Sequence, residues 1–239
     1  MLLGIRLFFL GILCFAFFHA IPFEGLIFRQ LFRWQHIITA RYRELIVNAD
    51  QALRLDDLLK GDIEAAVLDR FWNRASIVAQ VASQAARKLR GIAPDLVYTY
   101  ALFHDAAVPV MMRRFKDYGA MLEHVEKSGA SLVAEEDARY RCTHAVVGAM
   151  LARNWGLSAS ISSAVRFHHD REVYDLANPF LDDQTLSLIA VTHVAEHLVL
   201  EQNGEADAEV GDLFPLAVAY LGLSKDDLHD LEELLAAQT

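Results

Sequence analysis

Apolar side chains recur along most of this chain at intervals of three and four residues, the spacing of one face of an α-helix. The pattern runs through residues 31–60 and 63–89. It returns over 95–115, with a break at Val108-Pro109, and over 117–128. Alternating polar and apolar runs, which would indicate half-buried strands, are not seen in the sequence. The pattern therefore predicts an all-α fold, a bundle of helices.

Capping residues set the expected helix ends in the second half of the chain. Thr143 precedes HAVVGAMLARNWG, so we expect a helix that begins after Thr143 and stops at Gly156. A serine, Ser158 or Ser160, then caps a helix that ends near His168-His169. The remaining expected elements are a helix over 182–201, a polar loop over 203–212, and a last helix after a capping box at Ser224-Lys225-Asp226-Asp227.

The first 43 residues differ from the rest in charge and hydropathy. They hold five arginines and a single acid, Glu24, and residues 7–18 (LFFLGILCFAFF) carry no charge. Residues 2–23 are long enough to cross a bilayer, at about 20 residues for a core of ~30 Å. The predicted domains are an apolar helix over 1–28, a helical connector over 29–62 and a main helical domain over 63–239.

Three interpretations of this apolar segment stay open. It can anchor the chain at the inner membrane, because the arginines that follow it would keep the main domain in the cytoplasm. It can be a cleaved signal peptide, although Arg6 is the only basic residue before the apolar run and the Phe18-His19-Ala20 exit is a poor cleavage site. It can also be a fully buried first helix of a helical domain.

Composition narrows the class of protein further. With 54% apolar and 23% charged residues in 239, the chain is neither disordered nor of low complexity. Its two cysteines, Cys14 and Cys142, exclude a disulfide scaffold and a four-thiolate zinc site. The net charge of −10 argues against a nucleic-acid partner, since such binders neutralise phosphates with basic side chains.

Histidines and acids are the most informative residues of the main domain. Imidazole and carboxylate are ligand types for zinc, iron and manganese, and separate helices of a bundle can bring them together. Asp105 lies in an apolar stretch, where an unpaired carboxylate is costly. Each histidine taken alone can equally be a packed or capping residue. The candidates are His104-Asp105, His144, His168-His169, and His193 with Glu196 and His197.

His193-Val194-Ala195-Glu196-His197 also matches H-x-x-E-H, the inverted motif of some zinc proteases. Its two histidines would share one helix face, as zinc binding requires. Five matched positions are weak support in a chain with ten histidines, so a polar stripe on a helix is the simpler interpretation.

Three segments together resemble the HDOD domain, a degenerate relative of the HD and HD-GYP metal-dependent phosphohydrolases. They are FWNRASIVAQVASQAARKL (71–89), YALFHDAAVPVMMRRF (100–115) and THAVVGAMLARNWGLSASISSAVRFHHD (143–170). The resemblance extends over about residues 65–235. It implies that a metal ion, if one is bound, is held by His104, Asp105, His144, His168 and His169, with Glu196 as a further position.

The chain also departs from this family pattern. Arg74 stands where the relatives have their first ligand histidine, and arginine cannot bind a metal. Ala106-Ala107-Val108 replaces the Ile-Gly-Lys that follows the His-Asp doublet in catalytic relatives, and no Gly-Tyr-Pro signature follows. We therefore expect Arg74 to lie beside Asp105 and to take the place of a bound cation.

The resemblance and its departures imply a non-catalytic regulatory module of a bacterial signal-transduction type, which acts through a protein partner. On this interpretation no cofactor is expected, and any that binds would be a divalent transition-metal ion. The module would be a cytoplasmic domain, with the membrane surface as a further partner through residues 2–23. The alternatives are a metal-dependent phosphohydrolase that acts on a phosphoester or nucleotide, and a membrane-tethered helical scaffold.

Overall fold

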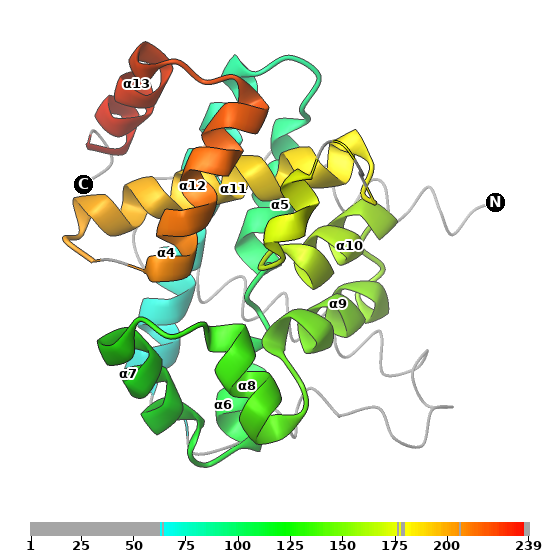
Figure 1. Ribbon diagram of the computed structural model, residues 1–239, viewed down its shortest axis with the longest axis vertical. Coiled ribbons are helices and arrows are strands. Elements are labelled where there is room, and N and C mark those ends of the chain that lie inside the picture. The colour runs from blue at the N-terminus through cyan, green and yellow to red at the C-terminus, as the bar shows by residue number, and fades with distance from the viewer. Residues whose placement is uncertain (1–62, 64, 176, 178–179, 206, 237–239) are drawn as a thin grey trace. The chain divides into compact units, whose positions relative to one another are not determined.

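The computed structural model describes residue 63 and residues 65–175, 177, 180–205 and 207–236 (Figure 1). Every regular element in this part of the chain is helical, which confirms the all-α prediction. The elements are α4 (Ala65–Lys88), α5 (Pro94–Phe103), α6 (Val108–Arg114), α7 (Tyr118–Ser128), α8 (Leu132–Tyr140), α9 (His144–Asn154), α10 (Ala159–Phe167), a 3-10 helix η1 (Arg171–Tyr174), α11 (Asp183–Gln202), α12 (Ala208–Leu221) and α13 (Lys225–Ala236).

The predictions for the apolar helix at 1–28 and the connector at 29–62 concern residues outside the described part of the chain. Among the helices that are described, none combines the length and the apolar character needed to cross a membrane. The anchor formed by residues 2–23 stays a prediction.

Side-chain caps define several helix starts where the sequence predicted them. Thr143 Oγ1 accepts a hydrogen bond from the Val146 amide at 3.3 Å, and Ser158 Oγ accepts one from Ile161 at 3.2 Å. Gly156, in a left-handed conformation with φ of +72°, follows the end of α9. These caps fix the positions of α9, which begins with His144, and of α10, which His168 and His169 directly follow.

Two helices differ from the sequence prediction. The loop expected over 203–212 is shorter, because Asp207 Oδ1 accepts hydrogen bonds from the amides of Glu209 and Val210 and starts α12 at Ala208. Helix α8 was not predicted. Its start is fixed by Ser131, whose hydroxyl accepts a hydrogen bond from the Ala134 amide.

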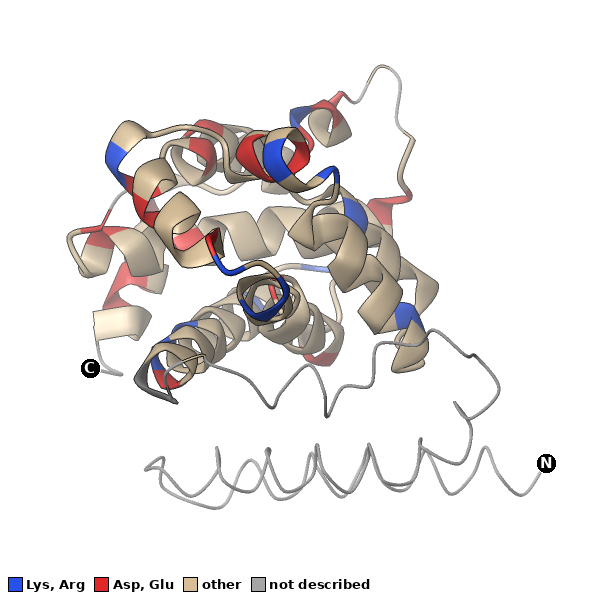
Figure 2. Cartoon of the chain, turned by 90° about the horizontal axis from the view of Figure 1, so that it is seen from below, with Lys and Arg blue, Asp and Glu red and all other residues tan. Residues whose placement is uncertain are grey.

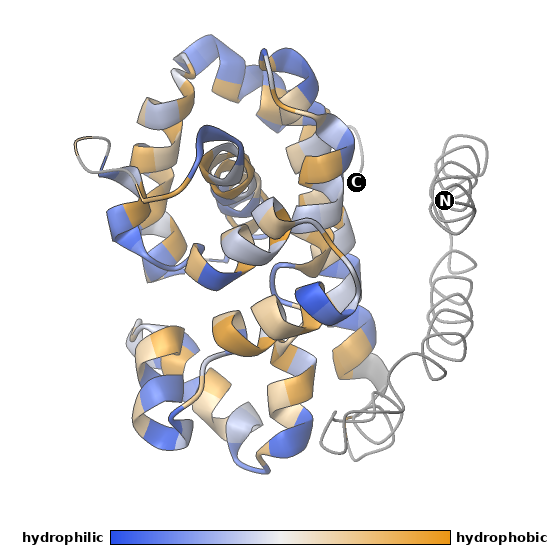
Figure 3. Ribbon diagram, turned by 90° about the vertical axis from the view of Figure 1, so that its right-hand side faces the viewer, coloured by the Kyte–Doolittle hydropathy of each residue, from blue (hydrophilic) through white to orange (hydrophobic). Residues whose placement is uncertain are grey.

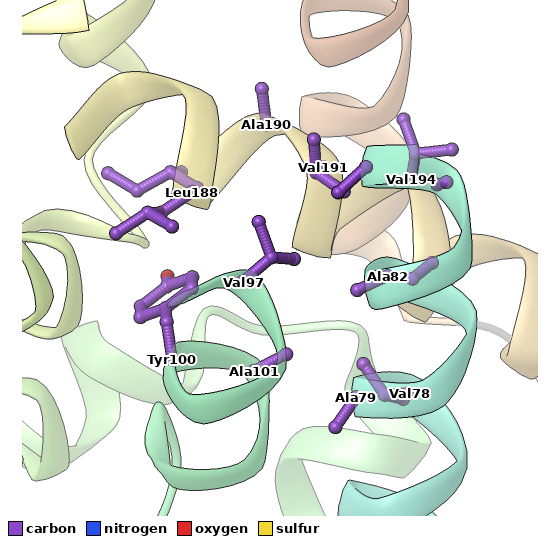
Figure 4. Close-up of a cluster of buried hydrophobic side chains, with 14 of the residues drawn as sticks. Val78, Ala79, Ala82, Val97, Tyr100, Ala101, Leu188, Ala190, Val191 and Val194 are labelled. Carbon is purple, nitrogen blue, oxygen red and sulfur yellow. The ribbon is translucent and has the colours of Figure 1, made fainter. Parts of the chain in front are cut away.

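The main hydrophobic core surrounds α11, which is buried on nearly all sides and runs through the middle of the bundle (Figure 1). Small side chains of α4 allow that helix to pack closely against α5 and α11 (Figure 4). The side chains at this contact are Val78, Ala79 and Ala82 of α4, Val97, Tyr100 and Ala101 of α5, and Leu188, Ala190, Val191 and Val194 of α11. Close packing here holds the end of α5 against the middle of α11.

A second, smaller core lies within α6, α7 and α8, which we call the small lobe. Val108, Met111, Tyr118 and Met121 are buried in it. Figures 1 and 3 show these three helices grouped at one end of the bundle, with apolar positions turned toward one another. The charged positions visible in Figure 2 lie mostly on the outer faces and ends of helices, acids and bases interspersed. The small lobe therefore has a core of its own beside the main one.

Candidate metal centre

Helix ends bring the candidate residues together. His104 and Asp105 directly follow α5, His144 is the first residue of α9, and His168 and His169 directly follow α10. Glu196 comes from the buried middle of α11. The structure thus joins all six of these sequence-predicted residues in one cluster, which we call the centre.

Asp105 is the carboxylate at the middle of the centre. Its Oδ1 atom lies 3.4 Å from His144 Nε2 and 3.3 Å from His168 Nε2. His169 Nε2 lies 2.8 Å from His144 Nε2. One ligand atom from each of these four residues lies within 4.8 Å of all the others. Two ligands at about 2.1 Å from one ion stand about 3.0–3.4 Å apart, so these spacings suit a shared transition-metal ion.

A second group of ligands uses the other oxygen of the same carboxylate. His104 Nε2 lies 3.3 Å from Asp105 Oδ2 and 3.0 Å from Glu196 Oε1. The ligand atoms of His104, Asp105 and Glu196 likewise all lie within 4.8 Å of one another. Asp105 is therefore shared by two adjacent sets of ligands.

Hydrogen bonds behind the rings orient all four imidazoles in the same way. Backbone carbonyls accept from Nδ1 in two of them: Ala101 O from His104 at 2.7 Å, and Val165 O from His168 at 2.8 Å. Carboxylates accept from Nδ1 in the other two: Glu136 from His144 at 2.8 Å, and Glu209 from His169. With Nδ1 donating, a neutral imidazole has its lone pair on Nε2. In the neutral form that binds metal, all four Nε2 atoms would therefore direct lone pairs into the centre.

Whether a metal ion fits the centre can be judged from the hydrogen-bond acceptors that converge there. Oδ1 of Asp105 and Nε2 of His168 are buried and have no hydrogen-bond partner. Buried polar atoms without a partner are costly, and two facing acceptors repel each other. A divalent cation would bind both atoms at once. The ligand set of imidazole and carboxylate, with Nδ1 held from behind, is also the usual environment of a protein-bound transition metal.

The pKa values of the clustered residues also indicate that the carboxylates of the centre attract positive charge. Burial alone would lower the pKa of His144, but the adjacent carboxylates of Asp105 and Glu136 outweigh it and raise the pKa to about 9. Burial would raise the pKa of Glu196, yet the neighbouring His104 lowers it to about 2. Burial, with the charges of His168 and His144, holds the pKa of His169 well below its usual range. Protons on His104 and His144 therefore supply positive charge to the centre in the metal-free chain.

Two carboxylates of the centre were missed by the sequence analysis. Glu136, fully buried in α8, holds His144, and Glu209, in the first turn of α12, holds His169. Glu136 could have been found from its spacing, since it lies on the same helix face as the apolar Leu132 and Tyr140. Glu209 lies in the stretch that its polar composition assigned to a loop.

The predicted pairing of Arg74 with Asp105 is wrong. The guanidinium of Arg74 forms an ion pair at 3.5 Å with Glu205, and its side chain is 45% exposed. The physical reason is its position on α4, where Ala75 takes the buried place and residue 74 faces outward. Arg74 therefore does not replace a cation in the centre.

The H-x-x-E-H motif does not form a zinc site. His193 Nε2 donates to the backbone oxygen of His168 at 2.9 Å, while its Nδ1 lies 2.8 Å from the Tyr174 hydroxyl. His197 stacks on Phe214 with ring centroids 3.9 Å apart. His193 therefore supports the backbone at His168, and of the three polar residues of the motif only Glu196 reaches the centre.

The fold is shared with solved structures. A protein from Shewanella amazonensis SB2B, described as a candidate phosphohydrolase, is 17% identical with a TM-score of 0.57, over 92% of this chain and 85% of its own. An HDOD domain protein of unknown function from Geobacter sulfurreducens is 21% identical with a TM-score of 0.52, over 76% of this chain and 61% of its own. No curated protein matches the sequence.

The family itself is shown by the sequence. The model of the HDOD domain matches residues 46–171, more than half of the chain. The match begins within the segment predicted as a connector and includes the ligands from His104 to His169. Together with the shared fold, this match shows that the chain belongs to the HDOD domain family.

Proposed function

We propose that this chain is a non-catalytic regulatory module that acts through protein contacts, and that its helical bundle is locked by a divalent transition-metal ion at the centre. The residues that would hold the ion are Asp105, His144, His168 and His169, with His104 and Glu196 as an adjacent set. The convergence of unpartnered acceptors on the carboxylate of Asp105 is the observation that carries the metal.

The charge of the centre supports a regulatory over a hydrolytic role. Four carboxylates lie in or directly behind it: Asp105, Glu136, Glu196 and Glu209. In the described part of the chain, none of them forms an ion pair with a lysine or an arginine. Phosphoryl transfer relies on positive groups that bind and neutralise the phosphate. One divalent ion would leave the centre negative, and two would only neutralise it, so a phosphate dianion gains little attraction.

Burial supports the same conclusion. His104, His144 and His168 are at most 3% exposed, as expected for an ion that ties helices together. An ion at this place would link the end of α5, the start of α9 and the end of α10. An ion that binds only the folded state raises the free energy of unfolding. A bundle stabilised in this way presents a fixed outer surface to a protein partner.

A metal-dependent phosphohydrolase is the second candidate, and one observation favours it. The side chain of Asp105 is 31% exposed, so the centre can be reached from solvent. When bound there, a metal ion would act as a Lewis acid and lower the pKa of a water molecule. The chain's own part in such a reaction would be to orient the ligands from behind through Glu136 and Glu209.

The test compares metal content and hydrolysis in three proteins. The wild-type chain, Asp105→Asn and the control Asp95→Asn, an exposed acid in the first turn of α5, are stripped with chelator and offered zinc, manganese or iron. We expect the wild type and the control to retain metal, Asp105→Asn to lose it, and none to hydrolyse p-nitrophenyl phosphate or its diester. Hydrolysis that disappears in Asp105→Asn alone would establish the second candidate. Equal, negligible metal in all three proteins would refute the metal site.

A further inference from the structure

Glu136 connects the centre to a part of the molecule that contributes no ligand. Its carboxylate is fully buried, and Oε2 accepts hydrogen bonds from the backbone amide of His144 at 3.0 Å and from His144 Nδ1 at 2.8 Å. Both the start of α9 and the ring of His144 are thus fixed by one carboxylate of α8. A carboxylate behind a histidine ligand orients the ring and raises its basicity.

Tyr118 extends this connection to α7. Its hydroxyl donates to Oε1, the other oxygen of Glu136, and its ring is fully buried in the core of the small lobe. The ring lies near Tyr140, the last residue of α8, with centroids 5.8 Å apart. A continuous path of hydrogen bonds therefore runs from α7 through α8 to His144, whose Nε2 faces Asp105.

This path lies where the small lobe meets the rest of the bundle. Buried carboxylates are stable only when donors surround them, and each of the three donors here comes from α7 or from the first residue of α9. If His144 turned away, Glu136 would lose a donor in a site with no water-facing surface. The orientation of His144 and the packing of α7 against α8 are thus mutually dependent.

We propose that Glu136 and Tyr118 are positioning residues that couple the ion at the centre to the small lobe, so that ion binding and the docking of α7 and α8 stabilise each other. This inference rests on the proposed function, because it requires the centre to bind an ion. Coupling of this kind is reciprocal: whatever weakens the path lowers affinity for the ion, and removal of the ion loosens the lobe. The small lobe is then the part of the surface that reports ion occupancy to a partner.

Glu136→Gln is the informative variant, because it preserves the shape of the side chain. The amide oxygen can accept both hydrogen bonds from His144 while the amide nitrogen faces the Tyr118 hydroxyl. The negative charge behind the imidazole is lost, and the Tyr118 hydroxyl changes from donor to acceptor. Tyr118→Phe removes one donor to Glu136 and touches no ligand. Glu135→Gln is the matched control, since Glu135 is the neighbouring acid on α8 and pairs with Arg139 at the surface.

The experiment uses the full chain and cobalt(II) as the probe. We expect Glu136→Gln to bind cobalt about 10- to 100-fold more weakly than Glu135→Gln. Tyr118→Phe should bind it about three- to tenfold more weakly. The visible absorption spectrum of bound cobalt should change in Glu136→Gln. Substitution of a residue that only supports the fold would leave this spectrum unchanged. In hydrogen exchange, cobalt should slow the amides of 118–128 and 132–140 by about tenfold or more, with α13 as internal control.

The outcomes separate this inference from the proposed function. The coupling is overturned, while the metal site stands, if the wild type binds cobalt and both variants bind it with an affinity within twofold of that of Glu135→Gln. Hydrogen exchange in the small lobe would then be the same with and without the ion. If the wild type takes up no cobalt at all, the proposed function fails and the coupling fails with it. Weakened binding together with ion-dependent protection of the small lobe supports both.

Discussion

Gly148 offers a direct test of how closely the helices around the centre are packed. A Cβ atom at this position of α9 would lie 2.9 Å from Cγ1 of Val165, 3.5 Å from the carbonyl oxygen of His104 and 3.6 Å from Cβ of Ala107. The nearest of these atoms belongs to a fully buried, β-branched side chain on α10, which has few rotamers to move into. Gly148→Ala therefore forces α9 away from α10.

Two effects of opposite sign decide the magnitude. Alanine in a helix interior is favoured over glycine by about 1 kcal/mol. Overpacking of a tight core costs about 1–3 kcal/mol. We expect the overpacking to prevail, so Gly148→Ala should lower the free energy of unfolding by about 1 kcal/mol and Tm by about 2–4 °C. Because α9 begins with His144, the same shift should also weaken metal binding.

The assay is urea denaturation of the metal-free chain with Gly211→Ala as the control. Gly211 lies in α12, and a Cβ atom there would have no neighbour within 4 Å, so alanine should raise the free energy of unfolding by about 0.5–1 kcal/mol. The double variant Gly148→Ala/Val165→Ala removes the clashing methyl group. Its free energy of unfolding should be about 1 kcal/mol higher than the value expected from adding the changes of the two single variants. Gly148→Ala as stable as Gly211→Ala would refute the close packing.

Two further predictions concern Arg74 and His193. Arg74→Ala should change the free energy of unfolding by less than about 0.5 kcal/mol and leave metal content unaltered, because its ion pair with Glu205 is largely exposed; a marked change in metal content would contradict this. His193 has a pKa lowered from 6.5 to about 4 by burial, so the unfolded chain takes up its proton first as pH falls. The stability it contributes is complete above pH 6.5 and should decline by up to ~3 kcal/mol toward pH 4. Urea denaturation of the metal-free chain against pH measures this, and His193→Gln should show a flatter profile.

Much of the fold could be predicted because local signals and packing agree. Thr143 and Ser158 cap their helices, and Ser224 and Asp227 form the reciprocal pair of a capping box, with Asp227 Oδ2 accepting from the Ser224 amide at 2.8 Å. Each of these bonds joins residues three apart in sequence, so the motif is visible without knowledge of the fold. Helix α8 was missed because it has only nine residues, 132–140, and they mix apolar and charged types.

The centre was predicted only in part, for a physical reason. His104, Asp105, His144, His168 and His169 are rare residue types in apolar surroundings, and their spacing fits a known family. The direction of a side chain is set by the rotation of its helix, which a single position does not show. The resemblance placed Arg74 at a ligand position, yet α4 turns it outward to Glu205. Glu209 looks like an ordinary surface acid until α12 is packed, and the sequence marks Glu136 only by its place on the apolar face of α8, a helix that was not predicted.

The shared carboxylate of Asp105 also constrains when an ion can be captured during synthesis. His104 and Glu196, its partners on one side, are 92 residues apart in the chain. A nascent chain that has emerged only as far as α9 carries an exposed Asp105 and His144 but neither of the histidines after α10. Domains fold as units once their last helices are available. The proposed ion would therefore be captured late, after α11 leaves the ribosome.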